Sequence, residues 1–301
     1  MTVPFSWNLV TDLRLMWQFA FMQNALEAGT IIALVAGIIG YFVVLRRSAF
    51  ATHALGHVGF SGAAGAVLFG VNPVYGLLAF TMSGATGMAL LGRRAANRDI
   101  EIGTVLAFML GLGLLFLSLY KGFATEAYSI LFGEVLGISA ASVVFTYEAS
   151  LAVLAVLLLV YRRLLFASLD EEVAEAKGLP MLALGLVFML LLAVAISIAV
   201  QVIGVLLIFA LMVTPAAIAV RLTTSPRGAI VVSVLVAVFS VWLGLFAAFF
   251  STAPYPPSFF IVTTAFVLYV AVRAIVALRA RLAPRAAVDL HPEPTPGHGT
   301  D

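Results

Sequence analysis

The chain has 301 residues, of which 63% are hydrophobic and only 10% are charged. Soluble domains carry about 25% charged residues, so this composition excludes an ordinary water-soluble protein and indicates one whose solvent is lipid. The net charge is only +2, which gives no basis for a nucleic-acid partner, and the absence of cysteine excludes disulfides and thiolate metal sites.

Residues 1–18 are mixed in polarity and lack the pattern of a cleavable signal peptide, so we expect an interfacial segment there. Residues 19–282 then form one transmembrane domain. A helix that crosses a bilayer needs roughly 20 apolar residues, and the abundance of alanine and leucine favours helices over barrel strands. The sequence therefore predicts an all-α polytopic membrane helix bundle of about nine spans, at 19–45, 54–71, 73–92, 102–120, 141–161, 180–199, 202–221, 228–250 and 258–278.

Arginines follow alternate predicted spans, which places nearly all of them on one side of the membrane. The positive-inside rule makes this side cytoplasmic, and against it stands Lys121, alone in an outer loop. We therefore expect a multi-pass protein of the cell membrane, with its N-terminus outside and its C-terminus in the cytoplasm. The arginines that set this orientation are Arg46, Arg47, Arg93, Arg94, Arg98, Arg162, Arg163, Arg221, Arg227, Arg273, Arg279, Arg281 and Arg285.

Two segments do not fit the pattern of spans. Residues 122–140 are too short and too polar to cross, and either a re-entrant half-helix or a helix on the outer surface is consistent with them. Residues 283–301 have the composition of a disordered C-terminal tail.

His53 and His57 form the most specific polar pattern in the chain. Residues four apart share a helix face, so two imidazoles at this spacing can bind one metal ion. The alternative is two neutral, hydrogen-bonded histidines that only tie helices together. A zinc protease needs glutamate directly after the first histidine, and Ala54 stands there. Gly56, Gly59, Gly62 and Gly65 follow at every third residue and favour close packing of this helix inside the bundle.

Three further residues are candidates for a gate or pathway. Asn24 and Glu27 lie near the outer end of the first span, where a hydrated rim would suit them equally well. Pro215 predicts a kink in the seventh span, which could serve as a hinge or only as a packing feature.

A short polar helix is predicted over 168–178, between the fifth and sixth spans. Ser168 and Glu171 have the spacing of a capping box, Asp170 and Glu172 add acids to the first turn, and Gly178 can end the helix in the left-handed conformation. The helix either lies on the membrane surface or is gripped by a cytoplasmic partner. No phosphate-binding loop occurs in the sequence, so any ATPase would be another chain.

Four stretches together resemble the permease family of metal-uptake ABC transporters. They are Arg46–His57 with the glycine-rich helix, Ile102-Gly103 with Leu131-Phe132-Gly133, Ser168–Leu179 including Ala174, and Val202–Ala217. The resemblance implies a dimeric permease that binds a cytoplasmic ATPase through 168–178 and receives its ion from an extracytoplasmic metal-binding protein.

The resemblance also bears on the ion. In the family the second-helix motif has an acid and a histidine; here His57 keeps the histidine, His53 replaces the aspartate and Gly56 replaces a serine. Imidazole suits zinc better than manganese, so we expect a carried divalent metal, zinc with manganese or iron as alternatives, and no permanently bound cofactor. A permease for metal chelates such as siderophores or cobalamin, a non-transporting helical scaffold and an intramembrane hydrolase are the competing interpretations.

Overall fold

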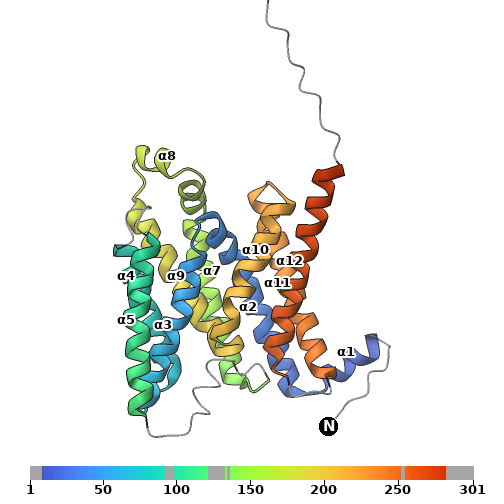
Figure 1. The fold of residues 1–301 in the computed structure, drawn as a ribbon. Coiled ribbons are helices and arrows are strands. Elements are labelled where there is room, and N and C mark those ends of the chain that lie inside the picture. The colour runs from blue at the N-terminus through green and yellow to red at the C-terminus, as the bar shows by residue number, and fades with distance from the viewer. Residues whose placement is uncertain (1–8, 92–97, 121–132, 134–135, 252–254, 283–301) are drawn as a thin grey trace, which may run out of the picture.

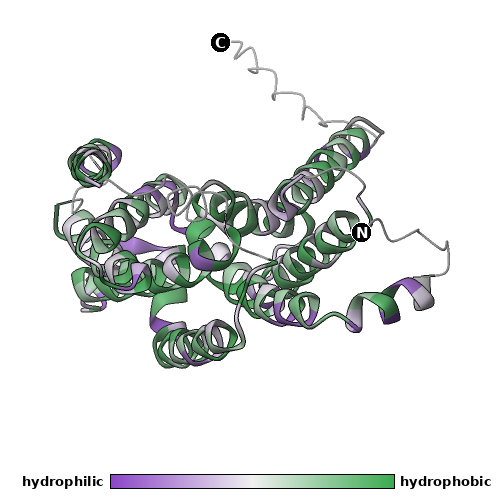
Figure 2. Ribbon diagram, turned by 90° about the horizontal axis from the view of Figure 1, so that it is seen from below, coloured by the Kyte–Doolittle hydropathy of each residue, from purple (hydrophilic) through white to green (hydrophobic). Residues whose placement is uncertain are grey.

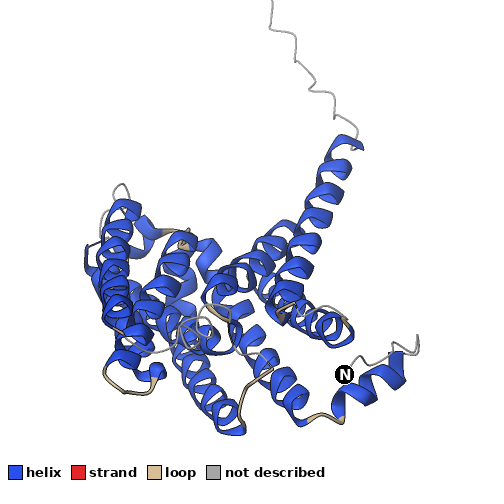
Figure 3. Cartoon of the chain, turned by 60° about the horizontal axis from the view of Figure 1, so that its bottom comes forward, coloured by secondary structure: helices blue, strands red, loops and turns tan. Residues whose placement is uncertain are grey.

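The computed structural model describes residues 9–91, 98–120, 133, 136–251 and 255–282. Within this part of the chain all regular secondary structure is helical (Figure 3). The helices are α1 (Leu9–Trp17), α2 (Ala20–Leu45), α3 (Ala49–Leu68), α4 (Pro73–Leu91), α5 (Arg98–Leu119), α7 (Ala140–Leu169), α8 (Glu171–Ala176), α9 (Met181–Ile203), α10 (Val205–Leu222), α11 (Pro226–Phe250) and α12 (Pro257–Leu282).

The predicted membrane bundle is confirmed. Among the described residues, seven helices are long and apolar enough to cross a bilayer: α2, α4, α5, α7, α9, α11 and α12. The apolar part of α10 is shorter, at Leu207–Leu222, and α3, which carries both histidines and four glycines, is not among the seven. Together these nine helices occupy the nine predicted ranges.

Two of the predicted span boundaries were wrong. α3 begins at Ala49, well before the predicted 54, because hydropathy registers the polar Thr52 and His53 but not the helical hydrogen bonding that starts after Ser48. α7 continues to Leu169, past the predicted end at 161, because arginine is a good helix former and its long side chain can reach the polar interface.

α2, α3 and α9 form the interior of the bundle. In the span windows of α2 and α9, 67% of the residues are buried, and most of α3 is buried as well. Only 17% of the window in α5 and 11% in α12 is buried, so these two helices lie at the periphery. Hydrophobic residues predominate along most of the helices (Figure 2). Some of them lie on the outside of the bundle, such as Leu159 in α7, which is 83% exposed.

The glycines of α3 allow the close packing that the sequence predicts. A Cβ atom on Gly62 would collide with the carbonyl group of Gly76 in α4, and one on Gly56 would touch Val205 and Ile208 in α10 at 3.5 Å. Apolar side chains gain nothing from leaving lipid, so helices in a membrane associate mainly through such close contacts and hydrogen bonds.

A buried hydrogen bond joins α4 to α9. The hydroxyl groups of Thr81 in α4 and Ser197 in α9 lie 2.7 Å apart. Both residues are almost completely buried, so this bond forms away from water and ties α4 to the central helix α9.

A break between α9 and α10 occurs at Gly204, whose φ of +90° lies in the region that favours glycine. The backbone of Gly133 lies directly against this break. A Cβ atom on Gly133 would come within 2.5 Å of the Gly204 nitrogen, so only a residue without a side chain fits there. The structure thus brings together two glycines that the family resemblance singles out.

The two ends of the bundle differ in the arginines that they carry. α1 lies at one end, whereas α8 and the C-terminal end of α12 lie at the other (Figure 1). At the α8 end, Arg46 and Arg47 lie in the turn between α2 and α3, and Arg221 in α10 and Arg227 in α11 flank the next turn. The described residues of the α1 end include the basic residue Arg14. This asymmetry agrees with a cytoplasmic α8 end, which stays a prediction.

Some predictions fall wholly or mostly outside the described residues. The C-terminal tail at 283–301 lies outside them, as does most of the proposed re-entrant segment at 122–140. In the N-terminal segment only α1 and Gln18 are described, where Asp12 and Met16 are buried and Trp17 is exposed. Its interfacial position stays a prediction.

Candidate functional site

His53 and His57 lie side by side on α3, as their spacing predicts. Their ring centroids are 4.7 Å apart and the ring planes are inclined by 81°. His53 is exposed and His57 is half-buried, so the pair opens onto the surface of the single chain. Two imidazoles at this separation can turn their nitrogens toward a common ion by side-chain rotation.

Neighbouring helices fix the position of the pair. The ring of Phe209 in α10 lies 5.7 Å from the His53 ring, in an edge-to-face arrangement. Between the two histidines, Gly56 brings the backbone of α3 against Val205 at the start of α10. The backbone carbonyl of His57 also accepts a hydrogen bond from the Ser61 hydroxyl, at 3.2 Å. Phe209 was not foreseen from the sequence.

One chain does not supply a complete metal site in its described part. No group of three or more His, Cys, Asp or Glu side chains there could hold a metal ion. Zinc sites in proteins have three or four protein ligands, nearly always arranged tetrahedrally. The pair therefore leaves coordination positions for water, for backbone oxygen or for a second chain.

The three predicted pathway residues are not grouped with the histidines. The Asn24 side chain donates a hydrogen bond to the carbonyl of Ile138, 3.0 Å away, and so ties α2 to the segment before α7. Glu27 is exposed one turn further along α2. Pro215 lies inside α10, which continues through it. A gate or pathway role for these residues stays a prediction.

The short helix α8 forms where the sequence predicts it, but its cap was assigned to the wrong residue. Asp170 is the N-cap, and its carboxylate accepts a hydrogen bond from the Val173 backbone at 3.0 Å. Ser168 instead belongs to the last turn of α7, where its hydroxyl bonds to the Leu164 carbonyl. Both residue types are good caps, and the unforeseen length of α7 decides between them.

The predicted end of α8 at Gly178 is confirmed. Gly178 has a φ of +77°, its N–H bonds to the Glu175 carbonyl at 2.8 Å, and the Leu179 N–H bonds to the Ala174 carbonyl at 3.2 Å. This pair of bonds is a Schellman motif, which satisfies the last carbonyls of a helix. The turn gives α8 a defined length.

α8 rests on the bundle through one side and presents the other. Ala174 is completely buried and packs with Ala167 and Leu184. Glu171 and Glu172 are exposed. The helix is therefore fixed to the bundle on one side and exposes acidic side chains on the other, where a partner protein can bind.

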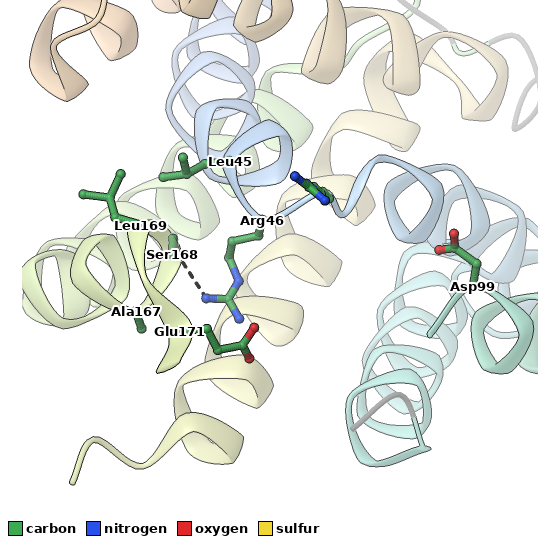
Figure 4. Close-up of a pocket in the computed structure, with 8 residues that line it drawn as sticks. Leu45, Arg46, Asp99, Ala167, Ser168, Leu169 and Glu171 are labelled. Atoms are coloured by element: carbon green, nitrogen blue, oxygen red, sulfur yellow. Dashed lines mark hydrogen bonds between the residues drawn. The ribbon is translucent and has the colours of Figure 1, made fainter. Parts of the chain in front are cut away.

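A polar pocket of about 540 Å³ lies beside α8 (Figure 4). Its basic side is Arg46 with Arg47, and its acidic members are Asp99 and Glu171. Arg46 donates a hydrogen bond to the Ser168 hydroxyl at 3.2 Å. The sequence pointed to Arg46 as a marker of orientation and as the start of a stretch that resembles the family, but no local pattern signals a contact between residues so far apart in the chain. The full lining is Leu45, Arg46, Arg47, Asp99, Ala167, Ser168, Leu169 and Glu171.

The model of one protein family, described as the ABC 3 transport family, matches residues 18–274. The chain belongs to this family. The match includes the histidine pair, α8 and both glycines of the α9–α10 junction. The family resemblance inferred from the sequence is thus confirmed.

Proteins named for different metals resemble this chain. The manganese transport system membrane protein MntC of Listeria monocytogenes is 31% identical over 233 residues, which is 77% of this chain and 83% of that protein. The high-affinity zinc uptake system membrane protein ZnuB of Haemophilus influenzae is 27% identical over 79% of this chain and 92% of that protein.

A solved structure shows the same architecture. PsaBC from Streptococcus pneumoniae in complex with Fab superposes with a TM-score of 0.77 and 27% identity, over 88% of this chain and 95% of that chain. This ABC 3 family chain is therefore a multi-pass membrane permease subunit of an ABC transporter and is not itself the ATPase.

Proposed function

We propose that this permease subunit imports a divalent transition metal, that zinc is its preferred ion, and that ATP hydrolysis on a separate chain drives the movement. The observation that carries the proposal is the pair of imidazoles, 4.7 Å apart, on the exposed side of α3. An ionisable pair within a membrane bundle is costly, so it indicates a functional site.

The choice of zinc rests on ligand chemistry. One relative is named for manganese and another for zinc, so their names do not decide the ion. Manganese is suited by carboxylate and other oxygen ligands, whereas neutral imidazole suits zinc. A site whose side-chain ligands are His53 and His57, with no carboxylate, therefore favours zinc.

A second copy of the chain would complete the site. His53 is exposed in the single chain, and the described residues supply no third ligand. Two copies facing each other across this side of α3 would bring four imidazoles together, the number that a tetrahedral zinc ion requires.

The other partners are assigned to opposite ends of the bundle. The exposed acidic face of α8 supports a docking site for the cytoplasmic ATPase. An extracytoplasmic metal-binding protein would then deliver the ion at the α1 end. This orientation follows the concentration of arginine at the α8 end.

Replacing His57 by alanine tests the metal site. We expect His57→Ala to abolish zinc uptake while the protein still inserts into the membrane, as measured with radioactive zinc in cells that express the variant. His291→Ala is the matched control, because it removes an imidazole of the C-terminal segment and should leave uptake unchanged. Wild-type uptake by His57→Ala would refute the site.

Replacing His53 by aspartate tests the choice of ion. A carboxylate in place of one imidazole should shift the preference toward manganese, because that ion favours oxygen ligands. Competition between zinc and manganese for uptake measures the shift. Unchanged competition would show that position 53 does not select the ion.

Charge reversal on α8 tests the docking site. We expect the double variant Glu171→Lys with Glu172→Lys to recover less ATPase on co-purification, whereas Arg227→Glu, at an exposed position of the same end, should recover a normal amount. Equal recovery by all three proteins would count against docking at α8.

Single cysteines test the orientation cleanly because the natural chain has none. Glu172→Cys should react with an impermeant maleimide only after the cell is opened. Val71→Cys, in the exposed turn between α3 and α4, should react in intact cells. The reverse pattern would overturn the proposed topology.

A further inference from the structure

Arg46 joins three parts of the bundle through one side chain. It is the C-cap residue of α2, and its guanidinium donates a hydrogen bond to the Ser168 hydroxyl at 3.2 Å. The same guanidinium lies over the ring of Phe188 in α9, 5.3 Å from the ring centroid. The side chain is half-buried. It therefore connects the α2–α3 turn, the end of α7 and a central helix.

The contact between Arg46 and Ser168 lies at the end of α7, where the chain continues into α8. Ser168 is in the last turn of α7, two residues before Asp170, the N-cap of α8. The Glu171 carboxylate of α8 and the Arg46 guanidinium also point toward one another across the pocket (Figure 4). A displacement of α8 that moved the adjoining last turn of α7 would therefore reach Arg46 through Ser168.

The turn after Arg46 is rigid. The Arg47 N–H bonds to the Val44 carbonyl at 3.2 Å, and the Ser48 N–H bonds to the Val43 carbonyl at 2.8 Å. This is a second Schellman motif, with Arg47 at a φ of +53° in the position that usually holds glycine. Hydrogen bonds at two points leave this turn little freedom to absorb movement.

The first residues of α3 continue directly from this turn. α3 begins at Ala49, and the Thr52 hydroxyl bonds back to the Ser48 carbonyl at 3.1 Å. His53 follows Ala49 by four residues, which is a rise of about 6 Å along the helix. Movement of Arg46 would therefore reach the histidine pair through a hydrogen-bonded turn and about one turn of helix.

We infer that Arg46 is the positioning residue that transmits displacement of α8 to α3, and so couples ATP hydrolysis to the state of the histidine pair. The inference rests on the proposed function and names the connection within it. A guanidinium suits this role because its planar fork can donate to the Ser168 hydroxyl while its face covers the Phe188 ring. Lysine lacks that fork.

The test is the number of ATP molecules hydrolysed per zinc ion transported, in liposomes that contain the permease and its ATPase, with the zinc-loaded metal-binding protein supplied on the side of the α1 end. We expect Arg46→Ala to raise this ratio at least tenfold, with normal recovery of the ATPase and a melting temperature near that of the wild type. The ratio of ATP hydrolysed to zinc transported for Arg46→Lys should lie between those of the wild type and Arg46→Ala. Arg162→Ala, at an exposed position near the same end of α7, is the control and should keep the wild-type ratio.

Ser168→Ala removes the acceptor from the other side of the contact and provides a second variant should Arg46→Ala fold poorly. We expect it to raise the ratio as well, and Arg46→Ala combined with Ser168→Ala to add little further. A wild-type ratio in Ser168→Ala, or in a folded Arg46→Ala, would overturn the inference. So would a loss of ATPase binding with an unchanged ratio, because that result would assign Arg46 to docking.

Failure of the proposed function gives a different result. If wild-type liposomes hydrolyse ATP but take up no metal, the importer proposal fails and this inference fails with it. If the wild type is coupled and the Arg46 and Ser168 variants are equally coupled, only the role of Arg46 is refuted.

Discussion

Ala174 should determine whether α8 stays seated on the bundle. Its side chain is 0% exposed and packs with Ala167 and Leu184. Ala174→Leu would force a larger side chain into this contact, and such overpacking typically costs about 1–3 kcal/mol. With only six residues, α8 has little stability of its own. The strain should therefore be relieved by lifting α8 off the bundle rather than by rearranging the spans.

A cost of about 1–3 kcal/mol corresponds to a change of about 5–150-fold in the equilibrium between seated and lifted α8. Hydrogen–deuterium exchange of residues 170–179 in nanodiscs measures this equilibrium, because amides exchange through local opening. We expect protection to fall by that factor in Ala174→Leu, with a parallel loss of ATPase recovery.

Ala176→Leu is the matched control, because Ala176 is exposed on the same helix. It makes the same substitution without overpacking and should retain wild-type protection. Equal protection in the two variants would refute the seating of α8 through Ala174. Free exchange of α8 in the wild type would refute it as well.

Three further predictions concern glycine and hydroxyl contacts. Gly178→Ala should destabilise the end of α8 by about 1 kcal/mol, measured by exchange of the same amides, because its φ of +77° disfavours a side chain although the space is open. Gly62→Ala should lower the melting temperature by forcing α3 from α4, whereas Gly111→Ala, where a Cβ atom would meet nothing within 4 Å, should not. A double-mutant cycle with Thr81→Val and Ser197→Ala should give a coupling energy of about 0.6 kcal/mol in unfolding experiments; a value near zero would contradict their hydrogen bond.

Local rules predicted the parts of the site that depend on a single helix. The four-residue spacing of His53 and His57 places both rings on one face, because it follows helical geometry alone. The end of α8 at Gly178 was equally predictable, because the left-handed conformation that closes a helix is one that glycine readily adopts.

Contacts between distant segments were not predictable from the sequence. Ser168 and Asp170 are both suitable caps, and which one starts α8 depends on how far α7 continues beyond the arginines. The contact of Arg46 with Ser168 and Phe188 depends on the packing of three helices, which no spacing in the sequence records. Phe209 beside His53 was missed for the same reason.

The junction between α9 and α10 has a consequence for how the sequence can vary. Gly204 has a φ of +90° and Gly133 a φ of +76°, and the backbone at Gly204 also fills the space that a side chain on Gly133 would need. Since each position has its own backbone conformation to satisfy, a change at one of them cannot relieve the other. A library with all amino acids at positions 133 and 204, selected for transport, should therefore return glycine at both positions and no pair of other residues.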